Sequence, residues 1–168
     1  MGQSIKPMIV IDTTRDSVRQ LLRTLPDKKQ ELKDTLERLS HELAEIPSAA
    51  VLRGRPFDAV QTKGTVDPYA KMDAAMAQIQ RDRSECWKEI DRAVESLTEL
   101  IRLETFISQM PGPEGKVLVG LYLDRRTWDS MQEEMECARP TIAHYRNRGI
   151  DRIIARLYSR IRTIQKVL

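Results

Sequence analysis

Two long stretches of this chain carry apolar residues at alternating spacings of four and three positions. The first repeat consists of Val18, Leu22, Leu25, Lys29, Leu32, Leu36, Leu39, Leu43 and Ile46. Such a repeat places one apolar stripe along a helix, and the stripe becomes buried when it packs against a partner helix. The first stretch, residues 14–46, is therefore predicted to be helical.

Prolines divide and end this first stretch. Pro26 has no backbone donor and fits best in the first turn of a helix. We therefore expect a short helix at 14–24 and a second helix at 26–46, which ends before Pro47.

The second stretch extends from about Tyr69 to Ser108 and contains no glycine or proline. Its repeat consists of Met72, Met76, Ile79, Arg83, Cys86, Ile90, Ala93, Leu97 and Leu100. One helix cannot bury its own stripe, so this helix either folds back on the first stretch or pairs with another subunit. The methionines and the cysteine of the repeat are interpreted as packing residues rather than metal ligands.

Residues that break helices predict the domain organisation. A loop at 47–68 joins the two stretches, and the segment MPGPEG at 110–115 contains two prolines and two glycines. We place the domain boundary at this second break. The expected organisation is then a flexible N-terminus at 1–13, a coiled-coil helical region at 14–109, a linker at 110–115 and a C-terminal domain at 116–168.

The C-terminal domain is predicted to begin with two short helices. The segment VLVGLYLDR, residues 117–125, fits the first of them. Thr127 is a suitable N-cap for the second, because its hydroxyl can accept a hydrogen bond from the first turn. One face of that second helix is apolar and consists of Trp128, Met131 and Met135.

A break at 136–138 precedes a third, basic helix with Pro140 in its first turn. Ile142 and Tyr145 are expected to point inward from this helix. Two short helices, a three-residue turn and a basic helix form the pattern of a helix-turn-helix. The predicted fold class is therefore all-α, with an N-terminal helical hairpin or coiled coil followed by a C-terminal helix-turn-helix.

Apolar spacing continues to the end of the chain through Ile150, Ile154, Leu157, Ile161, Ile164 and Leu168. This part of the third helix either packs on the helix-turn-helix core or dimerises as a zipper does.

Positive charge is concentrated at the C-terminal end. The chain as a whole carries a net charge of +3. Residues 138–168 contain eight basic residues and one acid, a net charge of +7, whereas the preceding residues carry −4. This asymmetry indicates a polyanionic partner for the basic end, or else a solvated basic helix face.

A helix-turn-helix places its second helix in the major groove of DNA, so outward residues of that helix are candidate contacts. They are Arg139, Thr141, Ala143, His144, Arg146, Asn147, Arg148 and Arg152. Arg139 is suited to guanine and Asn147 to adenine, because each side chain can form two hydrogen bonds to its base. The remaining three arginines are spaced to follow phosphates, whereas His144 is either a base or phosphate contact or an ordinary exposed histidine. In loop 47–68, basic residues either touch DNA or belong to a plain hairpin connection.

Other chemistry is not indicated. The two histidines are far apart, as are the two cysteines, so a zinc site is not expected, and no nucleophile–base arrangement is present. We therefore expect no enzymatic activity, no metal and no cofactor. No run of apolar residues is long enough to span a bilayer, so no membrane partner is expected.

The segment LYLDRRTWDSMQEEMECARPTIAHYRNRGIDRIIARL resembles the sigma-region-4-like helix-turn-helix of RinA/ArpU-type phage late-gene transcription regulators. The matching residues are Tyr122, Thr127, Trp128, Met131, Met135, Thr141, Ile142, Gly149 and Ile150. The upstream coils and polar loop are similar too, so the likeness covers about residues 28–158. It implies a phage or prophage protein in the cytoplasm of a bacterial host, at the nucleoid, that binds double-stranded DNA and controls late genes. It also implies that the coils supply a homodimer contact or a surface for host RNA polymerase.

Two residues depart from the pattern of this family. Glu136 replaces the turn glycine, and a non-glycine residue at positive φ costs about 1 kcal/mol. Ala138 replaces the capping serine, which removes about another 1 kcal/mol from the basic helix.

Two other classes of protein fit the same features. A phage small terminase subunit also joins a helical DNA-binding domain to oligomerising coils. A coiled-coil adaptor would bind a protein partner through its coils and carry a basic tail that is merely solvated.

Overall fold

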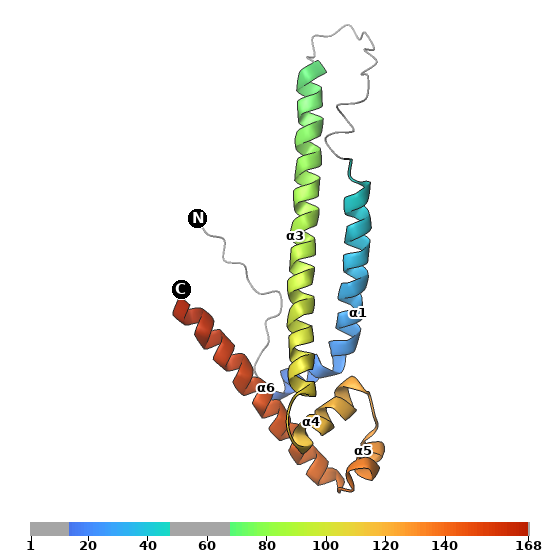
Figure 1. The fold of residues 1–168 in the computed structure, drawn as a ribbon, viewed down its shortest axis with the longest axis vertical. Helices are drawn as coiled ribbons and strands as arrows, with labels where there is room; N and C mark the ends of the chain where they lie inside the picture. Colours follow the sequence, from blue (N-terminus) through green and yellow to red (C-terminus); the bar gives the residue numbers. More distant parts are fainter. Residues whose placement is uncertain (1–13, 48–67, 168) are drawn as a thin grey trace. The chain divides into compact units, whose positions relative to one another are not determined.

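The computed structural model describes residues 14–47 and 68–167, with side chains for 14–47 and 70–157. These residues are all-helical and contain no strand, which confirms the predicted class for the described part (Figure 1). The predictions for residues 1–13 and most of loop 47–68 lie outside the described residues. The elements are α1 (Arg15–Glu45), α3 (Pro68–Ser108), α4 (Pro113–Leu118), a π-helical turn (Val119–Leu123), α5 (Trp128–Met135) and α6 (Arg139–Val167). No helix in the described ranges has a segment both long and apolar enough to cross a membrane.

Helix α1 is continuous across Pro26, so the prediction of two separate helices was wrong. Figure 1 shows that α1 changes direction in its blue N-terminal part. Proline removes one backbone hydrogen bond and bends a helix, but it does not end the helix when packing holds both sides. Here Leu22 and Leu25, on the N-terminal side of the proline, are fully buried. On the C-terminal side, Lys29 forms an ion pair with Glu104.

Both predicted apolar stripes are confirmed, because every member of each repeat is buried or half-buried. The described chain divides into two packing units, of which one comprises residues 32–95. In this unit the thiol of Cys86 donates to the carbonyl of Leu39 at 3.4 Å, and Arg83 donates to the carbonyl of Ile46 at 3.4 Å. The two helices therefore run antiparallel as a hairpin, and the cationic member of the second stripe binds the end of the first helix.

The other packing unit combines residues 14–31 with residues 96–167. It thus takes chain from both sides of the 110–115 break, where we expected the domain boundary. Its core consists of Val18, Leu22, Leu25, Ile107, Met110, Leu118, Tyr122, Ile150 and Ile153. Ile154 and Leu157 pack against this core, so the described part of the C-terminal repeat packs on the helices beside it.

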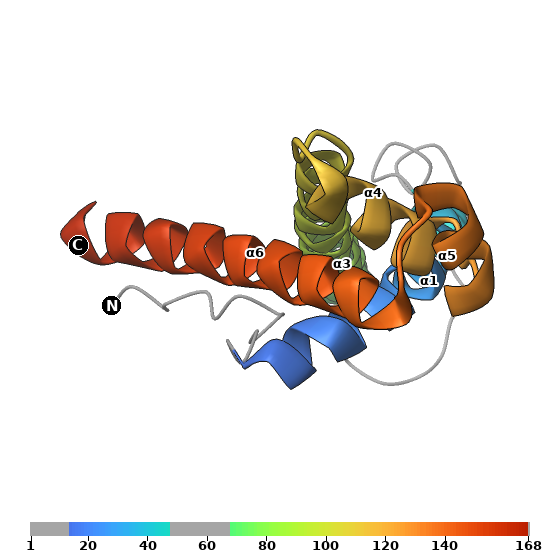
Figure 2. The ribbon, with the colours of Figure 1, turned by 90° about the horizontal axis from the view of Figure 1, so that it is seen from below.

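The start of α1 lies beside α6 in this unit, as Figure 2 shows. Arg15 donates two hydrogen bonds of 2.7 Å to the carboxylate of Asp151, and Arg19 donates to Asn147 at 2.9 Å. Residue numbers increase along α1 as they decrease along α6, so the two segments are antiparallel. The first turns of α1 are therefore an integral part of the unit that contains the basic helix.

Leu22→Ala tests whether the start of α1 supports the C-terminal helices. Leu22 is fully buried, so we expect its truncation to lower the free energy of unfolding by about 2–5 kcal/mol. The control is Ile101→Ala, because Ile101 is 44% exposed and should change this free energy by less than about 0.5 kcal/mol. Denaturant unfolding followed by circular dichroism measures both. Equally small losses of stability in the two variants would contradict the burial of Leu22 in the core of this unit.

Candidate nucleic-acid interface

Helix α5 begins with the predicted cap. The hydroxyl of Thr127 accepts a hydrogen bond of 3.2 Å from the backbone N–H of Ser130. The apolar face of α5 packs inward, with Met131 fully buried against Val117 and Ile142. Gly120 makes room for this packing, since a β-carbon there would lie 2.3 Å from the sulfur of Met131.

The connection from α5 to α6 adopts the strained turn expected from the sequence. Glu136 has φ 50° and ψ 36°, a left-handed conformation that favours glycine. Ala138 occupies the cap position of α6, where its carbonyl accepts from the N–H groups of Thr141 and Ile142 at 2.9 and 3.2 Å. The turn therefore has a non-glycine residue at positive φ, and the cap of α6 has no side-chain oxygen.

The inward face of α6 is also as predicted. Ile142 is fully buried, and Tyr145 packs against the same small cluster as Trp128 and Met135. Further along, Gly149 lies against Leu118, and a β-carbon there would come within 2.7 Å of that side chain. The first three turns of α6 are therefore held firmly against α4 and α5.

Two predicted contact residues share one aromatic ring. The guanidinium groups of Arg139 and Arg146 lie 5.3 and 5.1 Å from the ring centre of Trp128. Both distances are within the range of cation–π attraction. Arg139 is exposed and Arg146 is half-buried, while His144, between them in sequence, is exposed. Trp128 thereby orients two of the arginines on the N-terminal half of α6.

Asn147 faces α1 in this structure. Its side-chain oxygen accepts hydrogen bonds from Arg19 at 2.9 Å and from Arg146 at 3.1 Å. Two neighbouring guanidinium groups therefore already donate to the oxygen that, in the predicted DNA contact, would accept a hydrogen bond from adenine. The preceding candidates Thr141 and Ala143 are half-buried.

Arg148 and Arg152 lie beside Glu114, a carboxylate that is only 4% exposed. Their guanidinium nitrogens are 3.5 and 3.7 Å from one oxygen of Glu114, and Arg152 also donates to the carbonyl of Pro111 at 3.3 Å. A buried carboxylate is stable only when it is paired, so these two cations have a structural partner. Their assignment to phosphates stays a prediction.

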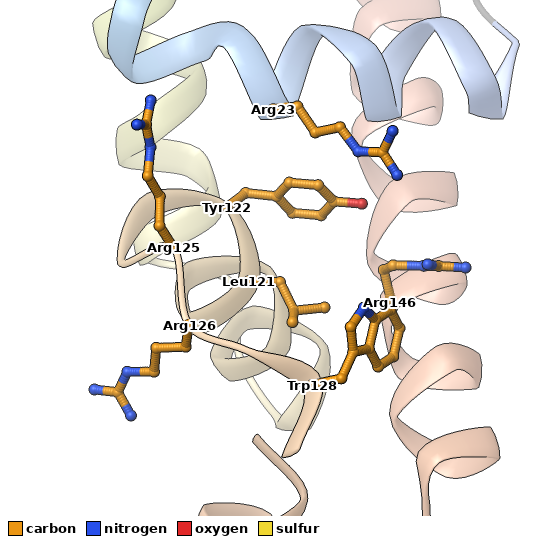
Figure 3. Close-up of a pocket in the computed structure, with 7 residues that line it drawn as sticks. All are labelled: Arg23, Leu121, Tyr122, Arg125, Arg126, Trp128 and Arg146. Carbon is orange, nitrogen blue, oxygen red and sulfur yellow. The ribbon is translucent and has the colours of Figure 1, made fainter. Parts of the chain in front are cut away.

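Three arginines that the sequence did not single out, Arg23, Arg125 and Arg126, line an open pocket together with the predicted contact Arg146 (Figure 3). We call it the basic pocket, and its volume is about 260 Å³. Its lining residues are Arg23, Leu121, Tyr122, Arg125, Arg126, Trp128 and Arg146. Arg23 comes from α1, so the pocket exists only because the start of α1 folds onto the C-terminal helices.

The electrostatics of the basic pocket are dominated by positive charge. Burial lowers the pKa of Arg146, and the nearby positive charges of Arg19 and Arg23 act in the same direction. Burial raises the pKa of the Tyr122 hydroxyl, so this group stays protonated at neutral pH and can donate a hydrogen bond. Among the described residues that line the pocket there are four arginines and no carboxylate, so the pocket presents donors and positive charge.

Comparisons with protein-family models, curated proteins and solved structures found no match to the chain. The function proposed below therefore rests on the geometry and the charges of this chain.

Glu136→Gly tests the strain in the turn. Glycine has no β-carbon to clash in the left-handed conformation, so we expect the free energy of unfolding to rise by about 1 kcal/mol. Glu136→Ala is the control, because it removes the same charge but keeps the β-carbon. An equal change in both variants in denaturant unfolding would attribute the effect to the charge and contradict the strain.

Glu114→Gln tests the ion pairs of Arg148 and Arg152. We expect a loss of about 1–3 kcal/mol in the free energy of unfolding, because two guanidinium groups lose a buried counter-charge while remaining partly hydrated. Glu133→Gln on α5 is the control, since Glu133 is exposed. Urea unfolding at neutral pH compares the two variants. A Glu114→Gln protein as stable as the control would show that the pairs contribute nothing.

Proposed function

We propose that this protein binds double-stranded DNA and regulates transcription, with α5, residues 136–138 and α6 acting as a helix-turn-helix. In this proposal the first turns of α6 enter the major groove. The protein would then belong to the class of RinA/ArpU-type phage late-gene regulators, which its sequence resembles.

The observation that carries the proposal is the way in which α6 is fixed. A three-residue connection joins it to the capped helix α5, and the fully buried Met131 and Ile142 hold the two helices together. The opposite side of the first two turns of α6 stays open, including exposed Pro140 and His144. An α-helix presented in this way fits the major groove, which is about 12 Å wide.

Charge adds support to the proposal. The net charge of +7 in residues 138–168 favours a polyanion, and Arg139 and Arg146 are oriented on Trp128 at the start of this segment. Arg139 is the candidate base contact, because it is exposed at the N-terminal end of α6. Arg146 is the candidate phosphate contact.

One observation favours the adaptor as a second candidate. Trp87 and Val94, seven residues apart on α3, are 50% and 45% exposed. Large apolar side chains that recur at this spacing on an open face are typical of a helix that binds another helix. The hairpin would in that case bind a helix of a protein partner.

Fluorescence anisotropy tests the proposal with two labelled duplexes, one from upstream of the protein's own gene and one scrambled, across a salt series. We expect a preference of about a hundredfold or more and a steep salt dependence. Arg139→Ala should reduce that preference by about tenfold to a hundredfold, because a bidentate base contact is worth about 1–3 kcal/mol.

Arg92→Ala is the matched control, since Arg92 is an exposed arginine of α3 and should leave both affinities unchanged. Equal binding to the two duplexes would contradict a sequence-specific regulator. Absence of binding to either would contradict the DNA proposal and favour the adaptor. The molar mass from light scattering distinguishes a regulator from the terminase alternative, because a small terminase subunit is expected to form a large ring.

A further inference from the structure

The inner part of the basic pocket combines two arginines with one tyrosine. In Figure 3 the hydroxyl of Tyr122 points toward the space between the guanidinium groups of Arg23 and Arg146. These three residues come from α1, the π-helical turn and α6, which are parts of one packing unit. The three side chains therefore line the same pocket from three different elements.

The positive charges of the pocket are not equally balanced. Arg125 forms an ion pair with Asp27, and Arg126 forms one with Glu134. Among the described residues, no carboxylate pairs with Arg23 or Arg146. The charge excess is thus located at the Tyr122 side of the pocket.

Arg146 is less exposed than the other three arginines of the pocket. It is half-buried, and the contacts of its guanidinium are the oxygen of Asn147 and the ring of Trp128. Neighbouring Arg19 donates to Asp16 and Asn147, while its Nε is buried without a hydrogen-bond partner in the described structure. Partly buried cations that repel one another are stabilised when an anion enters between them.

We infer that the basic pocket binds a phosphate group, with Arg23, Arg146 and the hydroxyl of Tyr122 as its donors. Phosphate presents several acceptor oxygens in different directions, which suits donors that converge from three elements better than a planar carboxylate does. A nucleobase is a poorer fit, because Arg139 and Arg146 already contact the ring of Trp128 on which it would stack.

The phosphate has two chemical sources, and only one of them rests on the proposed function. A phosphodiester of DNA bound by α6 would reach the pocket, since Arg146 lies two turns from Arg139 and contacts the same ring. A small phosphate-containing molecule would supply the same group without DNA. The first source makes α1, through Arg23, a part of the DNA-binding surface.

The first arm of the test measures phosphate alone. The chain has two tryptophans, so Trp87→Phe leaves Trp128 in the pocket as the only one. Its fluorescence is titrated with inorganic phosphate and with pyrophosphate, against chloride at constant ionic strength. We expect a saturable change in fluorescence. Arg23→Gln and Tyr122→Phe should each lower the affinity for phosphate by about tenfold, whereas Arg92→Gln should leave it unchanged.

The second arm measures DNA affinity over a salt series in the full chain. If the phosphate belongs to DNA, Arg23→Gln lowers the slope of log affinity against log salt by about 0.9, the value for one phosphate contact. If Arg23→Gln leaves the slope unchanged but lowers the affinity for inorganic phosphate, the phosphate site is supported and its ligand is a small molecule rather than DNA. Circular dichroism verifies folding of each variant, and Tyr122→Phe provides an independent test should Arg23→Gln be unstable.

The two proposals fail in different ways. The phosphate site is overturned if neither the phosphate response nor the DNA salt slope depends on Arg23 and Tyr122. A protein that binds phosphate through these residues but binds no duplex contradicts the proposed function and supports the site.

Discussion

Burial of the first apolar side chains of α1 against the C-terminal helices determines which charged groups of α1 lie beside α6. Val18, Leu22 and Leu25 are fully buried in the same core as Leu118 and Ile150. Once these side chains are buried, the helical period of α1 fixes the positions of its polar residues. Arg15 and Arg19 then bind Asp151 and Asn147 of α6. Arg23, one turn further on, lines the basic pocket. The packing of one apolar stripe thus sets the electrostatics of the surface beside α6.

The same stripe serves two purposes along the length of α1. Its N-terminal part completes the core around α4 and α6, and the part after residue 31 pairs with α3 as an antiparallel hairpin. Pro26 lies in the N-terminal part, where the helix bends. A bend costs one hydrogen bond, whereas ending the helix would expose the leucines on one side of the proline or the other. Continuity of α1 is therefore the favourable outcome.

Much of the fold was predictable because it depends on local spacing. The apolar repeats identified both long helices and the buried members of each, and Thr127, Ile142 and Tyr145 lie as their positions in the sequence indicate. Local rules failed at Pro26, because they do not include the tertiary packing that holds a bent helix together. The left-handed conformation of Glu136 was expected only from the resemblance, in which this position is a turn glycine.

The candidate site was predicted only in part, since charge pairing is not local. Asn147 engages a residue 128 positions earlier in the chain, and Arg148 and Arg152 pair with a glutamate on another helix. No spacing rule within α6 indicates either partner. Arg23 was missed for the same reason, because its role depends on the placement of α1 beside the C-terminal helices.

Trp128 links the exposed start of α6 to the basic pocket. Its backbone lies in the capped first turn of α5, and its ring orients both Arg139 and Arg146. The first of these arginines is exposed at the start of α6, and the second lines the basic pocket. An anion that neutralises Arg146 would reduce the repulsion of Arg146 from Arg19 and Arg23. Because Arg146 and Arg139 contact the same ring, the surroundings of Arg139 would change as well. If both proposals hold, phosphate binding in the pocket and base contact by α6 would be coupled through the ring of Trp128.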